Sequence, residues 1–258
     1  EIISNGQTVE LTTQNGRILD GNGGGVLNIT AATLMARAAL GIALDTAVSN
    51  LDLSTDAGDI ELTNTLSTPV TANVSVVGVG VVDLRQTGGG SLTVSDARTG
   101  EGDILLRVEG ADLDARMITA GGQGNVFLTT TTSGDVLLGT VSAVGDTVNI
   151  NSIGAVFDAL SGEAANLTAA TAMIEAVNGV GTGAEDIDTE LVSLDAQSSG
   201  VTGGIFVTEL ASGGDLNLSA RLTNAAGAGH VVVVAEGGSL TVWASGGGVA
   251  VAGSGNVL

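Results

Sequence analysis

The chain has 258 residues, a formal net charge of −21 and no cysteine or lysine. This charge argues against nucleic acid as a partner, because nucleic acid binds basic surfaces. The absence of cysteine excludes disulfides and cysteine-based metal sites. No apolar stretch approaches the length of a transmembrane helix, so the sequence predicts no membrane insertion.

The sequence contains an internal duplication, in which residues 8–94 are matched by residues 147–242. The string NITAAT at residues 28–33 returns as NLTAAT at residues 166–171, and GGSLTV at residues 89–94 returns unchanged at residues 237–242. The separation between matched segments grows along the chain, which indicates small insertions between equivalent units. Such self-similarity is typical of a repeat architecture, so we predict one continuous domain over residues 1–258.

The first element in chain order is residues 31–40, the one stretch with helix propensity. Its counterpart at residues 169–177 keeps the same threonine and alanine pattern. We therefore expect a strand in both copies, and a short inserted helix is the alternative.

Short runs of alternating apolar and polar residues then follow glycine, mostly at intervals of roughly 10 to 12 residues, a spacing typical of successive short strands. Their period of two and their content of Val, Ile, Leu and Thr predict strands, and the glycines supply the positive φ that turns need. Two strand-turn units give roughly 20–24 residues, a usual length for one coil of a β-solenoid. The residues expected to point inward are Ile60, Leu62, Leu92, Val94, Ile104, Leu106, Val126, Leu128, Val136 and Leu138.

The predicted fold is therefore all-β, with a β-sandwich of short repeated strands as the alternative. The chain has 1 proline, 41 glycines and only 2 % aromatic residues. Because sandwich cores usually contain bulky aromatic side chains, this composition favours the solenoid.

The segment NITAAT followed by LDTAVSNLDLSTDAGDIELTN resembles the repeat region of large secreted bacterial adhesins, the filamentous-haemagglutinin-like exoproteins often exported by two-partner secretion. The resemblance covers residues 8–66 and 147–210. It implies a right-handed parallel β-helix located outside the cell or on the bacterial surface. It also implies a structural segment, acting as a stiff rod or a filament-forming unit, and it identifies no receptor or surface ligand.

The densest acidic segment contains Asp186, Asp188 and Glu190 in alternation. A strand would place all three on one face, where hard oxygen ligands suit calcium. The first copy retains only Asp45 at the matching position, and a solvated loop is the alternative. Apart from this calcium, the sequence predicts no cofactor. Four further aspartates follow glycine at strand starts and are expected to cap turns: Asp59, Asp103, Asp135 and Asp215.

The sequence predicts no catalytic residues. His230 is the only histidine and Trp243 the only tryptophan, so neither a triad nor a sugar-stacking cleft is indicated. The alternative is a β-helical enzyme acting on acidic polysaccharide, which would pair arginine with carboxylates, as at Arg107 and Glu109 or over residues 112–116. A calcium-dependent repeat module is a further alternative, suggested by GGQGNVF at residues 121–127.

The two ends of the chain, Glu1–Ile3 and Val249–Leu258, carry strand pattern without an obvious polar cap. Solenoid ends normally need caps because an open strand edge templates another strand. We therefore expect the ends to contact adjoining coils of the same protein or to associate end to end with another copy.

Overall fold

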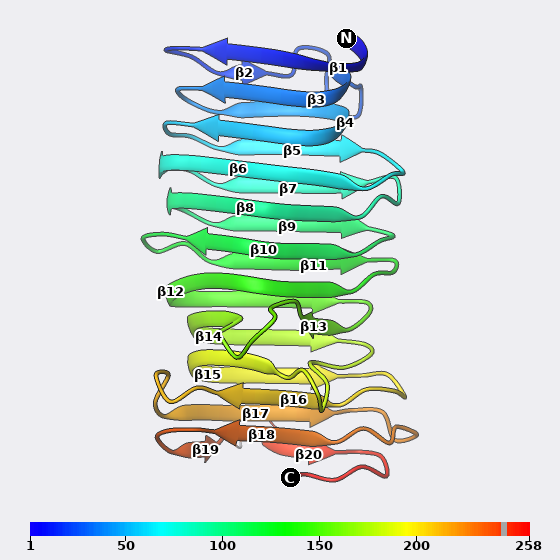
Figure 1. Ribbon diagram of the computed structural model, residues 1–258, viewed down its shortest axis with the longest axis vertical. Coiled ribbons are helices and arrows are strands. Elements are labelled where there is room, and N and C mark those ends of the chain that lie inside the picture. The colour runs from blue at the N-terminus through cyan, green and yellow to red at the C-terminus, as the bar shows by residue number, and fades with distance from the viewer. Residues whose placement is uncertain (244–246) are drawn as a thin grey trace.

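The structure is a computed structural model that describes residues 1–243 and 247–258. It is a β-solenoid of parallel strands with about 11 turns and about 22 residues per turn. Figure 1 shows the strands stacked along one axis, with the two termini at opposite ends of the stack. The predicted solenoid is confirmed. The β-sandwich alternative is wrong, because the described strands pair in parallel with strands of neighbouring coils.

The strands of the described residues run from one end of the stack to the other. In chain order they are β1 (Ile2–Thr13), β2 (Ile18–Leu19), β3 (Ile29–Ala38), β4 (Ile42–Thr55), β5 (Ile60–Thr65), β6 (Val70–Val79), β7 (Val82–Thr87), β8 (Leu92–Glu101), β9 (Ile104–Glu109), β10 (Leu113–Ala120), β11 (Val126–Thr131), β12 (Val136–Ser152), β13 (Val156–Asp158), β14 (Leu167–Ala176), β15 (Ile187–Ser198), β16 (Ile205–Glu209), β17 (Leu216–Leu222), β18 (Val231–Ala235), β19 (Leu240–Val242) and β20 (Val249–Val251).

In the middle of the stack, each coil is a longer strand followed by a shorter one, as in β6–β7, β8–β9 and β10–β11. Each strand pairs with its counterpart one coil away, β6 with β8 and β7 with β9. The stretches with helix propensity are strands β3 and β14, as expected. The described residues include no helix that could cross a membrane.

Alternation along the strands builds the core, because successive side chains of a strand point to opposite faces. All ten residues expected to point inward are at most 3 % exposed. They form aliphatic columns on two sides of the coil, since Ile60 stacks through Val82 on Ile104, whereas Leu92 stacks on Leu113. Burying apolar surface contributes about 25 cal/mol per Å² to the free energy of folding. These aliphatic columns are therefore the main source of stability.

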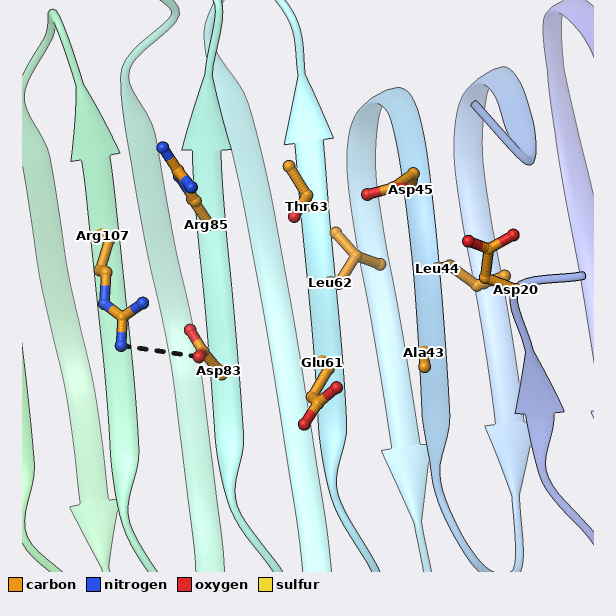
Figure 2. A pocket seen from close by; sticks show the side chains of 10 residues that line it. All are labelled: Asp20, Ala43, Leu44, Asp45, Glu61, Leu62, Thr63, Asp83, Arg85 and Arg107. Carbon is orange, nitrogen blue, oxygen red and sulfur yellow. Dashed lines mark ion pairs between the residues drawn. The ribbon is translucent and has the colours of Figure 1, made fainter. Parts of the chain in front are cut away.

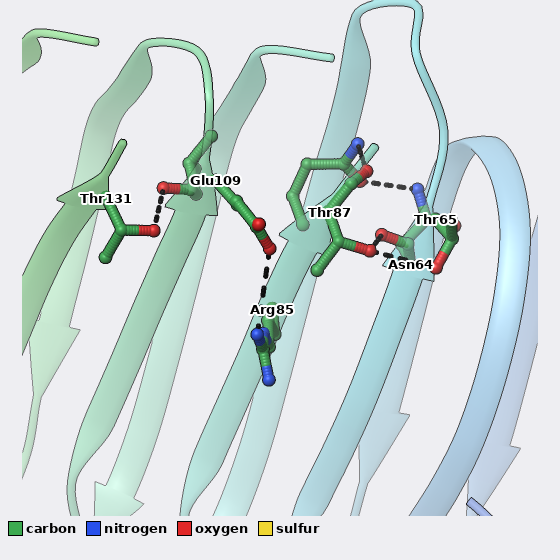
Figure 3. A network of polar contacts seen from close by, with 8 residues as sticks. Asn64, Thr65, Arg85, Thr87, Glu109 and Thr131 are labelled. Carbon is green, nitrogen blue, oxygen red and sulfur yellow. Dashed lines mark hydrogen bonds and ion pairs between the residues drawn. The ribbon is translucent and has the colours of Figure 1, made fainter. Parts of the chain in front are cut away.

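One inward column is polar near the amino-terminal end. Thr46 Oγ1 donates to Asn64 Oδ1 at 2.8 Å, and Asn64 Nδ2 donates to Gln86 Oε1 at 2.7 Å. All three residues are fully buried. Figure 3 shows Asn64 in this network and, on the outer face beside it, the contact between Thr65 and Thr87. The hydroxyl of Thr46 and the amides of Asn64 and Gln86 are therefore paired across three successive coils, which fixes the register of these coils.

The same irregularity lies at the start of each copy of the duplication. The pairing of β1 with β3 shifts between Ser4 and Thr8, and that of β12 with β14 shifts between Ala143 and Thr147. Gly6 and Gly145 lie within these bulges with φ of 72° and 85°. A glycine with positive φ therefore lies two residues before the start of each copy.

Equivalent residues of the two copies nevertheless occupy different columns. Val9 stacks on Leu34, in the column that continues to Val94 and Leu138. Its counterpart Val148 stacks on Val126, in the column that begins at Ile18. The reason is geometric: the separation of the two copies in sequence is not a whole number of coils of about 22 residues.

Glycines stack at the corner that precedes β5, β7, β9 and β11. At Gly102, φ is +134°, and a Cβ would lie 2.3 Å from the carbonyl oxygen of Gly80 in the preceding coil. Any side chain here would collide with the neighbouring backbone, so the close approach of the coils requires glycine.

Candidate functional site

An open groove of about 410 Å³ runs across β4, β5, β7 and β9 (Figure 2). Ten residues line it: Asp20, Ala43, Leu44, Asp45, Glu61, Leu62, Thr63, Asp83, Arg85 and Arg107. Arg107 lies 3.6 Å from Asp83, and Arg85 lies 3.7 Å from Glu109 in the next coil (Figures 2 and 3). The carboxylates of the lining outnumber the guanidinium groups, and both guanidinium groups are ion-paired. An acidic polysaccharide would therefore meet a net negative groove.

The other arginine considered for an enzyme acting on acidic polysaccharide, Arg116, forms an exposed ion pair. Arg116 Nε lies 2.9 Å from Asp114 Oδ2, and the arginine side chain is 62 % exposed. Pairs of this kind in water contribute about 0–1 kcal/mol. Arg107 thus pairs with Asp83 and Glu109 with Arg85, and Arg116 lies on an open surface.

A second site lies in the second copy, where the loop between β13 and β14 meets the start of β15. Oxygen atoms of Glu163, Asp186 and Asp188 all lie within 4.8 Å of one another. Glu163 is exposed, Asp186 is half-buried and Asp188 is 2 % exposed. Three carboxylates from two segments therefore converge on a small volume, as in sites that hold a hard cation.

Asp188 is the unusual member of this group. Its Oδ1 is buried and accepts no hydrogen bond from the described residues. Burial, and then the negative charge of Asp186 and Glu163, raise the pKa of Asp188 to about 6. The charged groups that act on it are all carboxylates, with Asp158 and Glu236 contributing less. An ionised Asp188 is therefore uncompensated by any positive charge of the described residues.

Asn166 positions the site. Its Nδ2 donates to Asp158 Oδ1 at 2.5 Å and to the carbonyl of Leu138 at 3.0 Å. Its Oδ1 accepts the backbone N–H of Asp188 at 2.9 Å. This fully buried amide fixes the base of the loop to β12 and β15 and so holds Glu163 against Asp188.

Of the three residues predicted to bind calcium, the structure brings two together. Asp186 and Asp188 belong to the acidic group, whereas Glu190 accepts hydrogen bonds from Thr168 at 3.3 Å and Ser212 at 2.5 Å. Glu163 takes its place. Glu163 was not predicted from the sequence as part of the acidic group because it lies in a loop of the preceding coil, and its only signal in the sequence was its position in the duplication.

The turn aspartates do cap turns, but in the neighbouring coil. Asp59 Oδ1 accepts the N–H of Val81, and Asp103 Oδ1 accepts the N–H of Asn125, each 22 residues further on. Asn125 belongs to the segment GGQGNVF, residues 121–127, that suggested a calcium-dependent repeat module. Its Oδ1 in turn accepts the backbone N–H of Thr147. Asp135 and Asp215 accept the N–H groups of Ala155 and Ser239 in the same way.

The single histidine and tryptophan lie far along the chain from the acidic group. His230 Nδ1 accepts the backbone N–H of Asn256 at 3.1 Å, which ties the last coil to the preceding one. Trp243 is 50 % exposed and lines a shallow groove with Met173 and Leu194.

Comparison of the chain with protein-family models, with curated proteins and with solved structures found no match. The fold itself assigns the chain to a class, the parallel β-solenoid repeat proteins.

Proposed function

We propose that this chain is a structural segment of a large extracellular bacterial adhesin or surface fibre, in which it acts as a stiff rod. The observation that supports the proposal is the continuous parallel pairing of strands from β1 to β20. Coils that contact only their neighbours form a quasi-one-dimensional object whose length grows with coil number. At about 4.8 Å per coil, about 11 coils give a rod on the order of 50 Å long.

The interior supports a mechanical role. The columns consist of Val, Leu, Ile and Ala that are almost fully buried along the stack. Interdigitated aliphatic side chains resist deformation because protein interiors are close-packed. The net charge of −21 favours solubility and opposes side-by-side association of such rods.

The edges of the stack suggest how the rod is extended. Ile2 and Ile3 in β1 are 45 % and 61 % exposed, and Val242 in β19, a strand near the opposite end, is 54 % exposed. Strand edges with exposed apolar side chains favour pairing with a further strand. The partner in our proposal is therefore β-structure, supplied by adjoining coils of the same protein or by a second copy stacked end to end.

The extracellular location rests on the resemblance of residues 8–66 and 147–210 to filamentous-haemagglutinin-like exoproteins. An antibody against the folded segment should label intact cells that produce the parent protein. Labelling only after the cells are lysed would contradict the proposal.

Removal of one whole coil tests the rod directly. Deletion of residues 82–103 joins Val81 to Ile104, and Ile104 occupies the same column as Val82. We expect this variant to fold and its maximum dimension in small-angle X-ray scattering to shorten by about 4.8 Å. The matched control, deletion of residues 82–92, removes half a coil, misplaces the columns and should abolish cooperative folding. A one-coil deletion that unfolds the chain would contradict a modular rod.

A further inference from the structure

In the first copy, the loop beside Asp45 forms hydrogen bonds with this residue. Asp45 Oδ2 accepts the backbone N–H of Gly25 at 2.6 Å, and its own N–H donates to Asn28 Oδ1 at 2.7 Å. Asn28 Nδ2 donates to Asp20 Oδ1 at 2.7 Å. The carboxylate of Asp45 is thus satisfied by the loop that covers it.

The second copy repeats this framework at matched positions. Asp158, Asn166 and Asp188 make the same bonds as Asp20, Asn28 and Asp45. The ungapped alignment that matches Asn28 to Asn166 also matches Gly25 to Glu163. The alignment that matches Asp45 to Asp188 likewise matches Ala43 to Asp186.

The two copies therefore differ at two positions beside this aspartate in the second copy. Where the first copy has a glycine N–H donor and an alanine, the second has the carboxylates of Glu163 and Asp186. No hydrogen bond to Asp188 Oδ1 replaces the one that Asp45 accepts from the Gly25 N–H, and two like charges lie beside it. As a result Asp188 Oδ1 is buried without a partner among the described residues.

We infer that Glu163, Asp186 and Asp188 bind a divalent cation, with Ca²⁺ as the fitting ion, and that this site is specific to the second copy. The ion occupies the place that the Gly25 N–H serves in the first copy and joins the β13–β14 loop to β15. The inference does not depend on whether the rod belongs to an adhesin.

The chemistry of the ligands favours calcium. Carboxylate oxygens are the hard donors that Ca²⁺ takes, and its flexible coordination of six to eight oxygens tolerates ligands from a loop and a strand start. Glu163 is exposed, so water can complete the coordination. Asp186 Oδ2 also accepts a hydrogen bond from Thr208 Oγ1, which orients its carboxylate.

The test is isothermal titration calorimetry of the 258-residue chain with CaCl₂ alone at constant ionic strength. We expect one saturable site with a Kd below about 1 mM. Glu163→Gly and Asp186→Ala, which restore the residues of the first copy, should each weaken binding at least about tenfold, and Asp188→Asn should abolish it. The matched control is Asp45→Asn, which should leave the Kd unchanged.

A second readout separates binding from folding. Saturating Ca²⁺ should raise the melting temperature of the wild type by roughly 5 °C. At the same Ca²⁺ concentration the rise should be clearly smaller in Glu163→Gly, whose exposed position leaves the core intact, and absent in Asp188→Asn. Absence of saturable binding in the wild type would overturn the inference. Binding that survives both Glu163→Gly and Asp188→Asn would overturn it as well, because the ion would then lie elsewhere.

Discussion

Asn64 and Glu209 occupy equivalent positions beneath Thr46 and Thr189 in the two copies. Asn64 Oδ1 accepts Thr46 Oγ1 at 2.8 Å and the N–H of Val48 at 2.9 Å. Glu209 accepts Thr189 Oγ1 at 2.6 Å through Oε2 and the N–H of Leu191 at 2.8 Å through Oε1. The same two donors are thus satisfied by a neutral amide in one copy and by a fully buried carboxyl group in the other.

Because Glu209 is a carboxyl group where the first copy has an amide, we predict that the stability of the chain depends on pH and that Glu209→Gln removes this contribution. Burial raises the pKa of Glu209 above its usual value. A raised carboxyl pKa stabilises the folded state below the unfolded pKa, and that stability is lost as pH rises through the folded pKa. Relative to Glu209→Gln, the wild type should therefore lose free energy of unfolding between about pH 4 and neutral pH, measured by denaturant titration. Parallel pH profiles of the two proteins would contradict the prediction.

The amide ladder of the first copy predicts a large loss of stability for Asn64→Ala. The substitution leaves the Val48 N–H, the Val48 carbonyl and Gln86 Oε1 without the partner they now have. Unpaired buried polar groups cost about 1–3 kcal/mol each, so the loss of three partners should lower the free energy of unfolding by at least about 3 kcal/mol in chemical denaturation. Thr65→Ala, one residue further and exposed, is the control and should change stability by less than about 0.5 kcal/mol. Equal effects of the two variants would be incompatible with this account.

The close contact at the glycine corner predicts that Gly102→Ala destabilises the rod. Its φ of +134° and the 2.3 Å distance from a Cβ to Gly80 O leave no space for a methyl group. We expect a loss of at least about 2 kcal/mol, seen as a lower melting temperature. Gly24→Ala, where nothing lies within 4 Å and φ is not in the left-handed region, should be neutral or slightly stabilising. A wild-type melting temperature for Gly102→Ala would show that the coils can separate there at no cost.

Salt should stabilise the chain. The 28 acidic residues face only 7 arginines, and the ion pairs are largely exposed, so screening removes more repulsion than attraction. The melting temperature should rise by a few degrees between about 10 mM and about 0.5 M NaCl, and KCl should act equally. A melting temperature that falls with salt would mean that the ion pairs dominate.

The inward residues could be predicted from the sequence because alternation is local. Ile60 and Leu62, or Ile104 and Leu106, are next-nearest neighbours on a strand and must share a face wherever that strand lies. The coil length could be predicted as well, since glycines that permit turns recur at regular intervals. The strand character of β3 and β14 followed from the comparison of two copies with the same pattern.

The acidic site and the buried carboxyl group were decided only by the tertiary structure. Contacts between Glu163 and Asp188, or between Glu209 and Thr189, join residues of neighbouring coils that are well separated in sequence. Their alignment depends on the register between coils and on loop insertions, which local periodicity does not encode. For the same reason, spacing along the strand suggested Glu190 as a ligand, but the adjacent coils supply Thr168 and Ser212 to that carboxylate instead.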